Sequence, residues 1–192
     1  NLHTAPGLAP ATPLLYNAQM GKVPLVVTVG QNDTRLLQKD PHLTGDITGI
    51  GRIHAKWSTE VLHSQDLPLV LRRAFKMAQQ APCGPVVVSL PQDVLQGEVD
   101  FEPAASCARP SRPRADREGI EQAAALLSQA QAPLVLIESG VARSDAVAEV
   151  VRLAELVGAP VYQAWMADVN FPVSHPLYLG DLDPTAPEAR DV

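Results

Sequence analysis

Two polar side chains near the start of the chain are the strongest candidates for chemistry. His3 lies in a polar opening, and Gln31 follows the apolar run 25–29 and Gly30. This run is apolar or β-branched throughout, which is typical of a strand buried on both faces. Because ligands bind beyond the carboxyl ends of parallel strands, both side chains are expected on the rim of one site. We expect the other parts of that site to lie outside this sequence.

His3 is the candidate acid–base group of this rim. An imidazole exchanges protons near neutral pH, and the residue is expected to end a strand just before a loop that leads into a helix. The other histidines are isolated and are interpreted as surface or turn residues; they are His42, His54, His63 and His175.

Alternating apolar strands and helices predict the framework that positions these side chains. Strands are expected at Leu25–Val29, Val86–Leu90, Leu134–Ile137 and Val161–Ala164. Helices are expected at 12–19, 34–39, 67–80, 116–130 and 144–157. A loop is expected at 40–51, an extended piece at 53–61 and a loop-rich part at 166–192. This alternation indicates βαβ units, so the predicted fold class is α/β with parallel sheets.

Prolines set the expected boundaries. Proline fits the first turn of a helix but breaks its interior, so no regular helix is expected before Pro13. The segment 92–113 is rich in proline and small residues and lacks periodicity, which is typical of an interdomain linker. The four strands are therefore expected to divide between two sheets.

Composition and missing motifs exclude several functions. The 192 residues are 46% hydrophobic with a net charge of −6, and no basic stripe suggests a nucleic-acid partner. No apolar run approaches the ~20 residues that span a membrane. Cys83 and Cys107 lack metal-ligand spacing and are interpreted as free thiols in a reducing cytoplasm. No phosphate loop, nucleophile elbow, zinc motif or dinucleotide fingerprint occurs, which disfavours a Rossmann-type dehydrogenase.

Several longer runs carry a resemblance to a known family. The chain contains NLHTAPG and NAQMGKVPLVVTVGQ, then KWS and RRAFKMAQQAPCGPVVVSLPQD. Phe171-Pro172 and His175-Pro176 follow further along. Together these runs resemble the thiamine diphosphate-dependent 2-keto-acid decarboxylase and acetolactate synthase family, most of all its benzoylformate decarboxylase branch. The resemblance covers nearly the whole chain and is strongest over residues 1–102.

The resemblance implies a domain organisation. Residues 1–102 would be the second half of a pyrimidine-binding, parallel-sheet domain, and residues 103–113 would be a linker. Residues 114–192 would begin a Rossmann-like middle domain. The chain would then be a fragment of a larger enzyme, in keeping with its start at Asn1 rather than at a methionine.

The resemblance also implies roles for three residues. His3 would face the substrate as a catalytic residue, and Gly7 and Gln31 would lie at the cofactor. No metal ligand is expected within this chain. The glutamate that contacts the cofactor would precede Asn1, and the Gly-Asp-Gly…Asn metal motif would belong to a third domain.

The implied activity belongs to the full-length protein. With thiamine diphosphate and Mg²⁺, most of whose ligands lie outside this chain, it would decarboxylate a 2-keto acid or join it to a second carbonyl compound through an enamine intermediate. A homodimer or homotetramer in the cytoplasm is expected, with no nucleic-acid or membrane partner. This chain by itself is expected to be inactive.

Two departures from the family pattern leave alternatives open. Ala9-Pro10 stands where the decarboxylases have Gly-Asn, and Pro13 stands where they have a further glycine. These changes predict a reshaped cofactor pocket and leave the identity of the 2-keto acid open. FAD in the middle domain is the less favoured option, because residues 113–192 lack a phosphate-cradling glycine cluster. A non-catalytic α/β module, structural or nucleotide-binding, is the alternative function.

Overall fold

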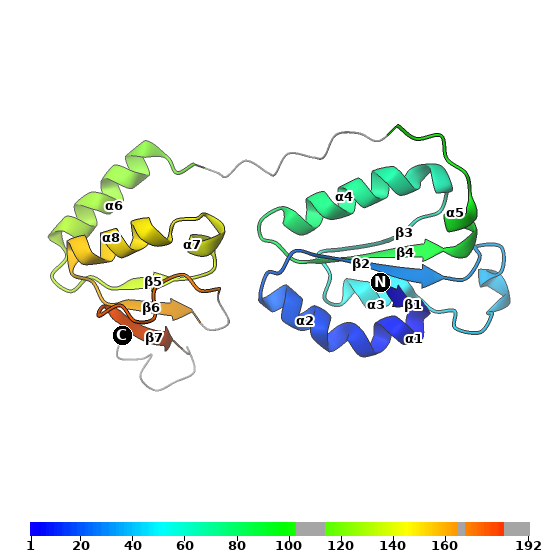
Figure 1. Ribbon diagram of the computed structural model, residues 1–192, viewed down its shortest axis with the longest axis horizontal. Coiled ribbons are helices and arrows are strands. Elements are labelled where there is room, and N and C mark those ends of the chain that lie inside the picture. The colour runs from blue at the N-terminus through cyan, green and yellow to red at the C-terminus, as the bar shows by residue number, and fades with distance from the viewer. Residues whose placement is uncertain (103–113, 165–167, 183–192) are drawn as a thin grey trace. The chain divides into compact units, whose positions relative to one another are not determined.

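The computed structural model describes residues 1–102, 114–164 and 168–182. The chain divides into two compact units, Asn1–Pro110 and Ser111–Val192. Each unit has its own parallel sheet, labelled in Figure 1. The linker expected at 103–113 lies outside the described residues.

The first unit is built on a four-stranded sheet in the order β1-β2-β4-β3. Its strands are β1 (Leu2–His3), β2 (Leu25–Gln31), β3 (Trp57–Glu60) and β4 (Pro85–Pro91). Every residue of β4 is buried, and β2 pairs with β4 along its whole length. Their apolar, valine-rich sequences fit a parallel sheet that is covered on both faces.

Helices cover the two faces of this sheet. The α-helices are α1 (Thr4–Leu8), α2 (Thr12–Met20), α3 (Ile47–Arg52), α4 (Leu67–Gln79) and α5 (Gln92–Gln96), with 3-10 turns at Ala9–Ala11, Leu37–Lys39 and Ser64–Asp66. One core packs α1, α2 and α3 against Val29 and Val87. A second core packs α4 and α5 against Val86 and Val88. Figure 1 shows α4 on one side of the sheet and α1–α3 on the other.

The second unit is smaller and has a three-stranded parallel sheet in the order β5-β6-β7. Its elements are α6 (Arg117–Gln129), β5 (Val135–Ile137), α7 (Gly140–Arg143), α8 (Val147–Val157), β6 (Val161–Ala164) and β7 (Tyr178–Leu182). Its buried core consists of Ile137, Ala154, Val161 and Phe171. The apolar face of α8 therefore supplies the main helical cover of this sheet.

The main elements expected from the sequence are confirmed. All four predicted strands are present, and they are parallel and divided between two sheets. The helices expected at 12–19, 67–80, 116–130 and 144–157 correspond to α2, α4, α6 and α8. The short helix expected at 34–39 is reduced to the 3-10 turn Leu37–Lys39.

Several local expectations are wrong. A helix, α1, does form before Pro13, because Pro6 lies in its first turn, where no intrahelical hydrogen bond is lost. The loop expected at 40–51 contains α3, since the Asp46 carboxylate caps the helix by accepting from Gly49 N and the side chain of Ile47 is buried.

Three further segments differ from expectation for the same kind of reason. The extended piece expected at 53–61 is a strand only over β3. The segment 92–113 does not begin as a linker, because α5 forms at once and buries Val94 in the first unit. The loop-rich part 166–192 contains β7, which gains its hydrogen bonds from β6. For α5 and β7 tertiary contacts outweigh weak local propensity, and residues 166–167 and 183–192 of the loop-rich part lie outside the described residues.

α3 packs closely against the sheet at Gly51, and this contact can be tested. A methyl group on Gly51 would lie 2.5 Å from Ser58 Oγ and 2.9 Å from Val87 Cβ, so only glycine permits this approach. The hydroxyl of Ser58 is buried there without a hydrogen-bond partner among the residues that the structure describes. An unsatisfied buried hydroxyl is a cost to the folded state.

We therefore expect opposite effects from two substitutions. Ser58→Ala removes the unsatisfied hydroxyl and should leave the free energy of unfolding unchanged or raise it by about 1 kcal/mol. Gly51→Ala should lower it by about 1–3 kcal/mol through overpacking. Calorimetry on both variants tests this contact, and a Ser58→Ala variant destabilised as much as Gly51→Ala would contradict it.

Candidate functional site

The parallel pairing of β1 with β2 places His3 at the carboxyl edge of the first sheet. Leu2 is in register with Val29, and His3 is in register with Gly30. Leu2 packs into the core shared with α1–α3, so the alternation of side chains along a strand directs His3 to the opposite face. His3 itself is exposed. Its imidazole is thus available to a ligand at the edge where parallel sheets bind ligands.

Two glycines flank the side chain of His3. A methyl group on Gly7, in α1, would lie 3.8 Å from His3 Cβ, and one on Gly30 would lie 3.9 Å from His3 Nδ1. Both distances are ordinary contacts, so the described packing does not itself require glycine at either position. Glycine in a helix or strand interior costs about 0.5–1 kcal/mol relative to alanine. The lack of a side chain at both positions beside His3 therefore fits a ligand that approaches the backbone closely.

The residue after His3 adopts a strained backbone. Thr4 has φ 53°, in the left-handed region, although it is β-branched and buried. Its hydroxyl donates to the His3 carbonyl at 2.8 Å. Such strain costs of order 1–3 kcal/mol and is concentrated at functional sites, where the surrounding structure holds it. The sharp turn from β1 into α1 brings Gly7 back beside His3.

Gln31 ends β2, but its side chain is used within the protein. The amide nitrogen donates to Gly45 O at 3.0 Å, and the amide oxygen accepts from Asn32 N at 3.0 Å. The side chain is only 7% exposed and points away from the face that carries His3 and Gly30, because strand side chains alternate. The structure thus brings His3 and Gly7 together and directs the amide of Gln31 to the loop that precedes α3.

Asn32 extends this anchoring of the same loop. Its amide nitrogen donates to His42 O at 3.0 Å and to Thr44 Oγ1 at 2.8 Å. Together Gln31 and Asn32 hold the segment 42–45 against the carboxyl end of β2. We interpret the contribution of Gln31 as positioning of this loop, and its cofactor-binding role stays a prediction.

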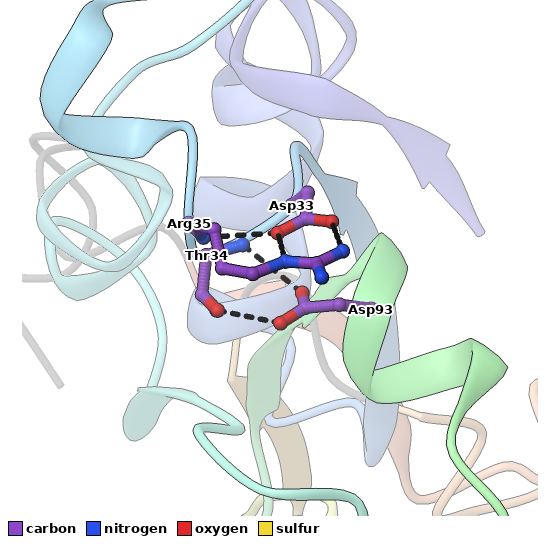
Figure 2. Close-up of polar contacts among 4 residues, drawn as sticks. All are labelled: Asp33, Thr34, Arg35 and Asp93. Carbon is purple, nitrogen blue, oxygen red and sulfur yellow. Dashed lines mark hydrogen bonds and ion pairs between the residues drawn. The ribbon is translucent and has the colours of Figure 1, made fainter.

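A second anchor joins the loop after β2 to the start of α5, as Figure 2 shows. Thr34 donates to Asp93 twice, from its backbone nitrogen at 3.0 Å and from its hydroxyl at 2.5 Å. Partial burial acts to raise the pKa of Asp93, but the hydrogen bonds from Thr34 outweigh it and hold that pKa below its usual range. The carboxylate therefore stays ionised at neutral pH and ties two loops of the carboxyl edge together.

Asp33 and Arg35 form an ion pair beside this anchor (Figure 2). Hydrogen bonds from the Arg35 side chain and backbone lower the pKa of Asp33 to about 2. The Arg35 side chain is largely exposed, so the pair contributes little to stability. Its geometric effect is to fix the turn that presents Thr34 to Asp93. Sequence reasoning missed this cluster because its two halves are 59 residues apart.

In the second unit a buried polar network lies at the carboxyl ends of β5 and β6. Asn170 accepts from Ala142 N at 2.9 Å through its side-chain oxygen, and its backbone nitrogen donates to Gln163 Oε1 at 3.2 Å. Ser139 Oγ accepts from Asp168 N at 2.9 Å. Asn170 is fully buried, and Gln163 and Ser139 are nearly so. The ends of β5 and β6 therefore meet side chains of this unit itself.

No metal centre is built by the described parts of the chain. Groups of three or more His, Cys, Asp or Glu side chains that could hold a metal ion are absent from residues 1–102, 114–164 and 168–182. Within the same ranges no helix is long and apolar enough to cross a membrane. The group that these residues offer for chemistry at the carboxyl edge of the first sheet is thus the exposed imidazole of His3, with Gly7 and Gly30 beside it.

Comparison with known proteins identifies relatives of this arrangement. Residues 120–191 match the family model for the central domain of thiamine pyrophosphate enzymes. The chain is 34% identical over 182 residues to the acetolactate synthase large subunit of Corynebacterium glutamicum, covering 92% of this chain and 29% of that protein. It is 33% identical over 167 residues to glyoxylate carboligase of Escherichia coli O157:H7, covering 86% and 28%.

Solved structures show the same relationship. A thiamin diphosphate-dependent enzyme from Mycobacterium smegmatis matches with a TM-score of 0.85 and 34% identity, covering 95% of this chain and 36% of that one. The 4-hydroxybenzoylformate decarboxylase of Rhodococcus jostii RHA1 matches with a TM-score of 0.85 and 31% identity, covering 95% and 35%.

The chain spans about a third or less of the length of these relatives. The matches nevertheless extend over almost all of it and agree with the resemblance carried by its sequence runs. Sequence and fold together show that this chain belongs to the family of thiamine diphosphate-dependent enzymes.

Proposed function

We propose that the full-length protein is a thiamine diphosphate- and magnesium-dependent enzyme that acts on a 2-keto acid, by decarboxylation or by carboligation. The observation that carries this proposal is the exposed imidazole of His3 at the carboxyl edge of the sheet, with the glycines Gly7 and Gly30 beside it. The relatives named as acetolactate synthase, glyoxylate carboligase and 4-hydroxybenzoylformate decarboxylase support it.

The same proposal assigns the two units to domains. Residues 1–102 would be the second half of the pyrimidine-binding domain, and residues 114–192 would begin the middle domain. The match of 120–191 to the central-domain model supports the second assignment. By family resemblance the full-length protein would be a homodimer or homotetramer in the cytoplasm.

In this proposal the residues of the chain position the substrate and move a proton. Thiamine diphosphate, when bound, supplies the stabilisation of negative charge that loss of carbon dioxide requires. Gly7 lets the cofactor approach the backbone of α1. His3 faces the reacting carbon and exchanges a proton through its imidazole, which is suited to this task near neutral pH. Gln31, Asn32 and the Thr34–Asp93 anchor keep the surrounding loops in place.

The first prediction concerns His3. In the full-length enzyme, His3→Ala should lower kcat by about 10²–10⁴-fold while changing the Kd for thiamine diphosphate much less, because an acid–base group acts mainly in the chemical step. Steady-state kinetics and cofactor titration measure the two effects, and a melting curve reports on folding.

His54→Ala is the matched control. His54 contacts Tyr16 and Gln19 and precedes β3, at the amino end of the sheet. Its replacement should leave kcat within about threefold of the parent, well below the acid–base range. If His3→Ala gives the same small change together with a lowered melting temperature, His3 is a structural residue and the proposal for it fails.

The second prediction concerns the 192-residue chain by itself. It should show no measurable decarboxylase activity and should bind thiamine diphosphate weakly or not at all. The reason is that its described residues offer no metal site, whereas diphosphate binding in this family depends on a metal. Calorimetry with and without Mg²⁺ is the measurement, and tight magnesium-dependent binding would contradict the prediction.

The third prediction concerns flavin. We propose that the middle domain carries no FAD, because Asn170, Gln163 and Ser139 fill the edge of the sheet where a dinucleotide would bind. The purified full-length enzyme should lack flavin absorbance near 450 nm, and added FAD should not raise its activity. Stoichiometric flavin that co-purifies with the protein would refute this.

A further inference from the structure

Gly30 stands at a position where the backbone does not call for glycine. It lies in the extended strand β2, between His3 of β1 and Leu90 of β4. Its φ is not in the left-handed region, so any residue could adopt this backbone. Glycine loses more conformational freedom than other residues and weakens a strand interior. Its presence in the middle of three paired strands therefore needs a steric reason.

The surrounding atoms of the chain do not supply that reason. The nearest atoms to a methyl group on Gly30 would be His3 Nδ1 at 3.9 Å and Leu2 O at 4.0 Å, which are ordinary contacts. Gly51 and Gly45 differ, because a methyl group there would lie 2.5 Å from Ser58 Oγ or from Ala5 Cβ. Packing thus explains the glycine at 51 and 45 but leaves the one at 30 unexplained.

The backbone of β2 around Gly30 is held in place on both sides. Val29 is fully buried, and Gln31 is tied to Gly45 and Asn32 by its side-chain amide. β2 is also paired on both sides at this position. A methyl group added at residue 30 would therefore lie beside His3, 3.9 Å from Nδ1, and would not be absorbed by a backbone shift.

From these observations we propose that Gly30 is a specificity-determining residue. Because it has no side chain, it leaves the position beside His3 Nδ1 to the substituent of the 2-keto acid, so that a bulky substrate can reach the imidazole. This inference deepens the proposed function and rests on it for the substrate class. The neighbouring Gln31 holds this part of β2 in place through its amide hydrogen bonds to Gly45 and Asn32.

The test is Gly30→Ala in the full-length enzyme, with Gly119→Ala as the matched control. Gly119 lies in α6 of the second unit, and a methyl group there would meet nothing closer than Asp116 Oδ2 at 3.9 Å. Turnover is measured with pyruvate and benzoylformate. Binding is measured by calorimetry with lactate and mandelate, which have the same carbon skeletons but no keto group to react.

One methyl group in a substrate pocket changes discrimination by about 10–200-fold. Gly30→Ala should therefore raise the Kd for mandelate at least tenfold more than the Kd for lactate. It should also lower kcat/KM for benzoylformate at least tenfold more than kcat/KM for pyruvate. The melting temperature should equal or exceed that of the parent, since alanine suits the strand better. Gly119→Ala should leave all four ligand measurements within twofold of the parent.

The outcomes separate this inference from the proposed function. If the parent turns over a keto acid but Gly30→Ala changes neither Kd nor kcat/KM by more than twofold, the inference about Gly30 fails while the proposed function stands. The inference also fails if the variant melts well below the parent, because glycine would then be needed for folding. A parent that binds mandelate in a Gly30-sensitive way without turning over either keto acid supports the inference and overturns the proposed reaction. A parent that neither binds nor turns over any of the four acids overturns both.

Discussion

The pairing of β2 with β4 is the constraint on which the first unit depends. It runs from Leu25↔Pro85 to Gln31↔Pro91 and brings both carboxyl ends to the same edge. β1 then adds to the free side of β2, which sets His3 level with Gly30. Because a shift of one residue would reverse the face of every side chain, this register alone decides that His3 and Gly30 share one face while Gln31 occupies the other.

The carboxyl edges of the two sheets are used differently. In the first unit the polar residues Asn32, Thr34 and Asp93 lie around the edge and bind neighbouring loops, while the side chain of His3 stays exposed. In the second unit Asn170 and Gln163 are buried within the edge itself. A buried amide pair of this kind stabilises the unit only while its hydrogen bonds are satisfied, so Asn170 and Gln163 Oε1 are engaged within the unit itself.

The sequence predicted the long, strongly patterned elements and missed those that depend on tertiary contacts. The buried apolar run of β2 and the amphipathic pattern of α4 are typical of a strand and of a helix, and both can be recognised from the sequence alone. α3 has two glycines in six residues and forms because Asp46 caps it and Ile47 is buried. β7 forms because β6 offers a paired edge. The Asp46 cap is a local signal, but the burial of Ile47 and the paired edge offered by β6 cannot be read from the residues of the element itself.

The candidate site residues also divide into those marked by a local pattern or a family resemblance and those that depend on tertiary contacts. His3 was found because a polar residue at the end of a strand is a local pattern, and Gly7 because a family resemblance placed it. The anchor between Thr34 and Asp93 was not found, since nothing in the spacing of two residues 59 positions apart marks them as neighbours. The direction of the Gln31 side chain was also beyond reach, because it requires the register with β4 and the position of Gly45.

Glycine shows most clearly what coordinates add to a sequence. Gly30 and Gly51 are the same residue type, and nothing in the short stretches around them distinguishes their roles. Only the surrounding atoms show that Ser58 and Val87 leave no room for a side chain at residue 51, whereas a methyl group at residue 30 would make only ordinary contacts, the nearest with the imidazole of His3. A glycine that packing requires reports on the fold. A glycine that packing does not require, on a rigid strand next to a group able to transfer protons, points instead to a molecule that the protein must admit.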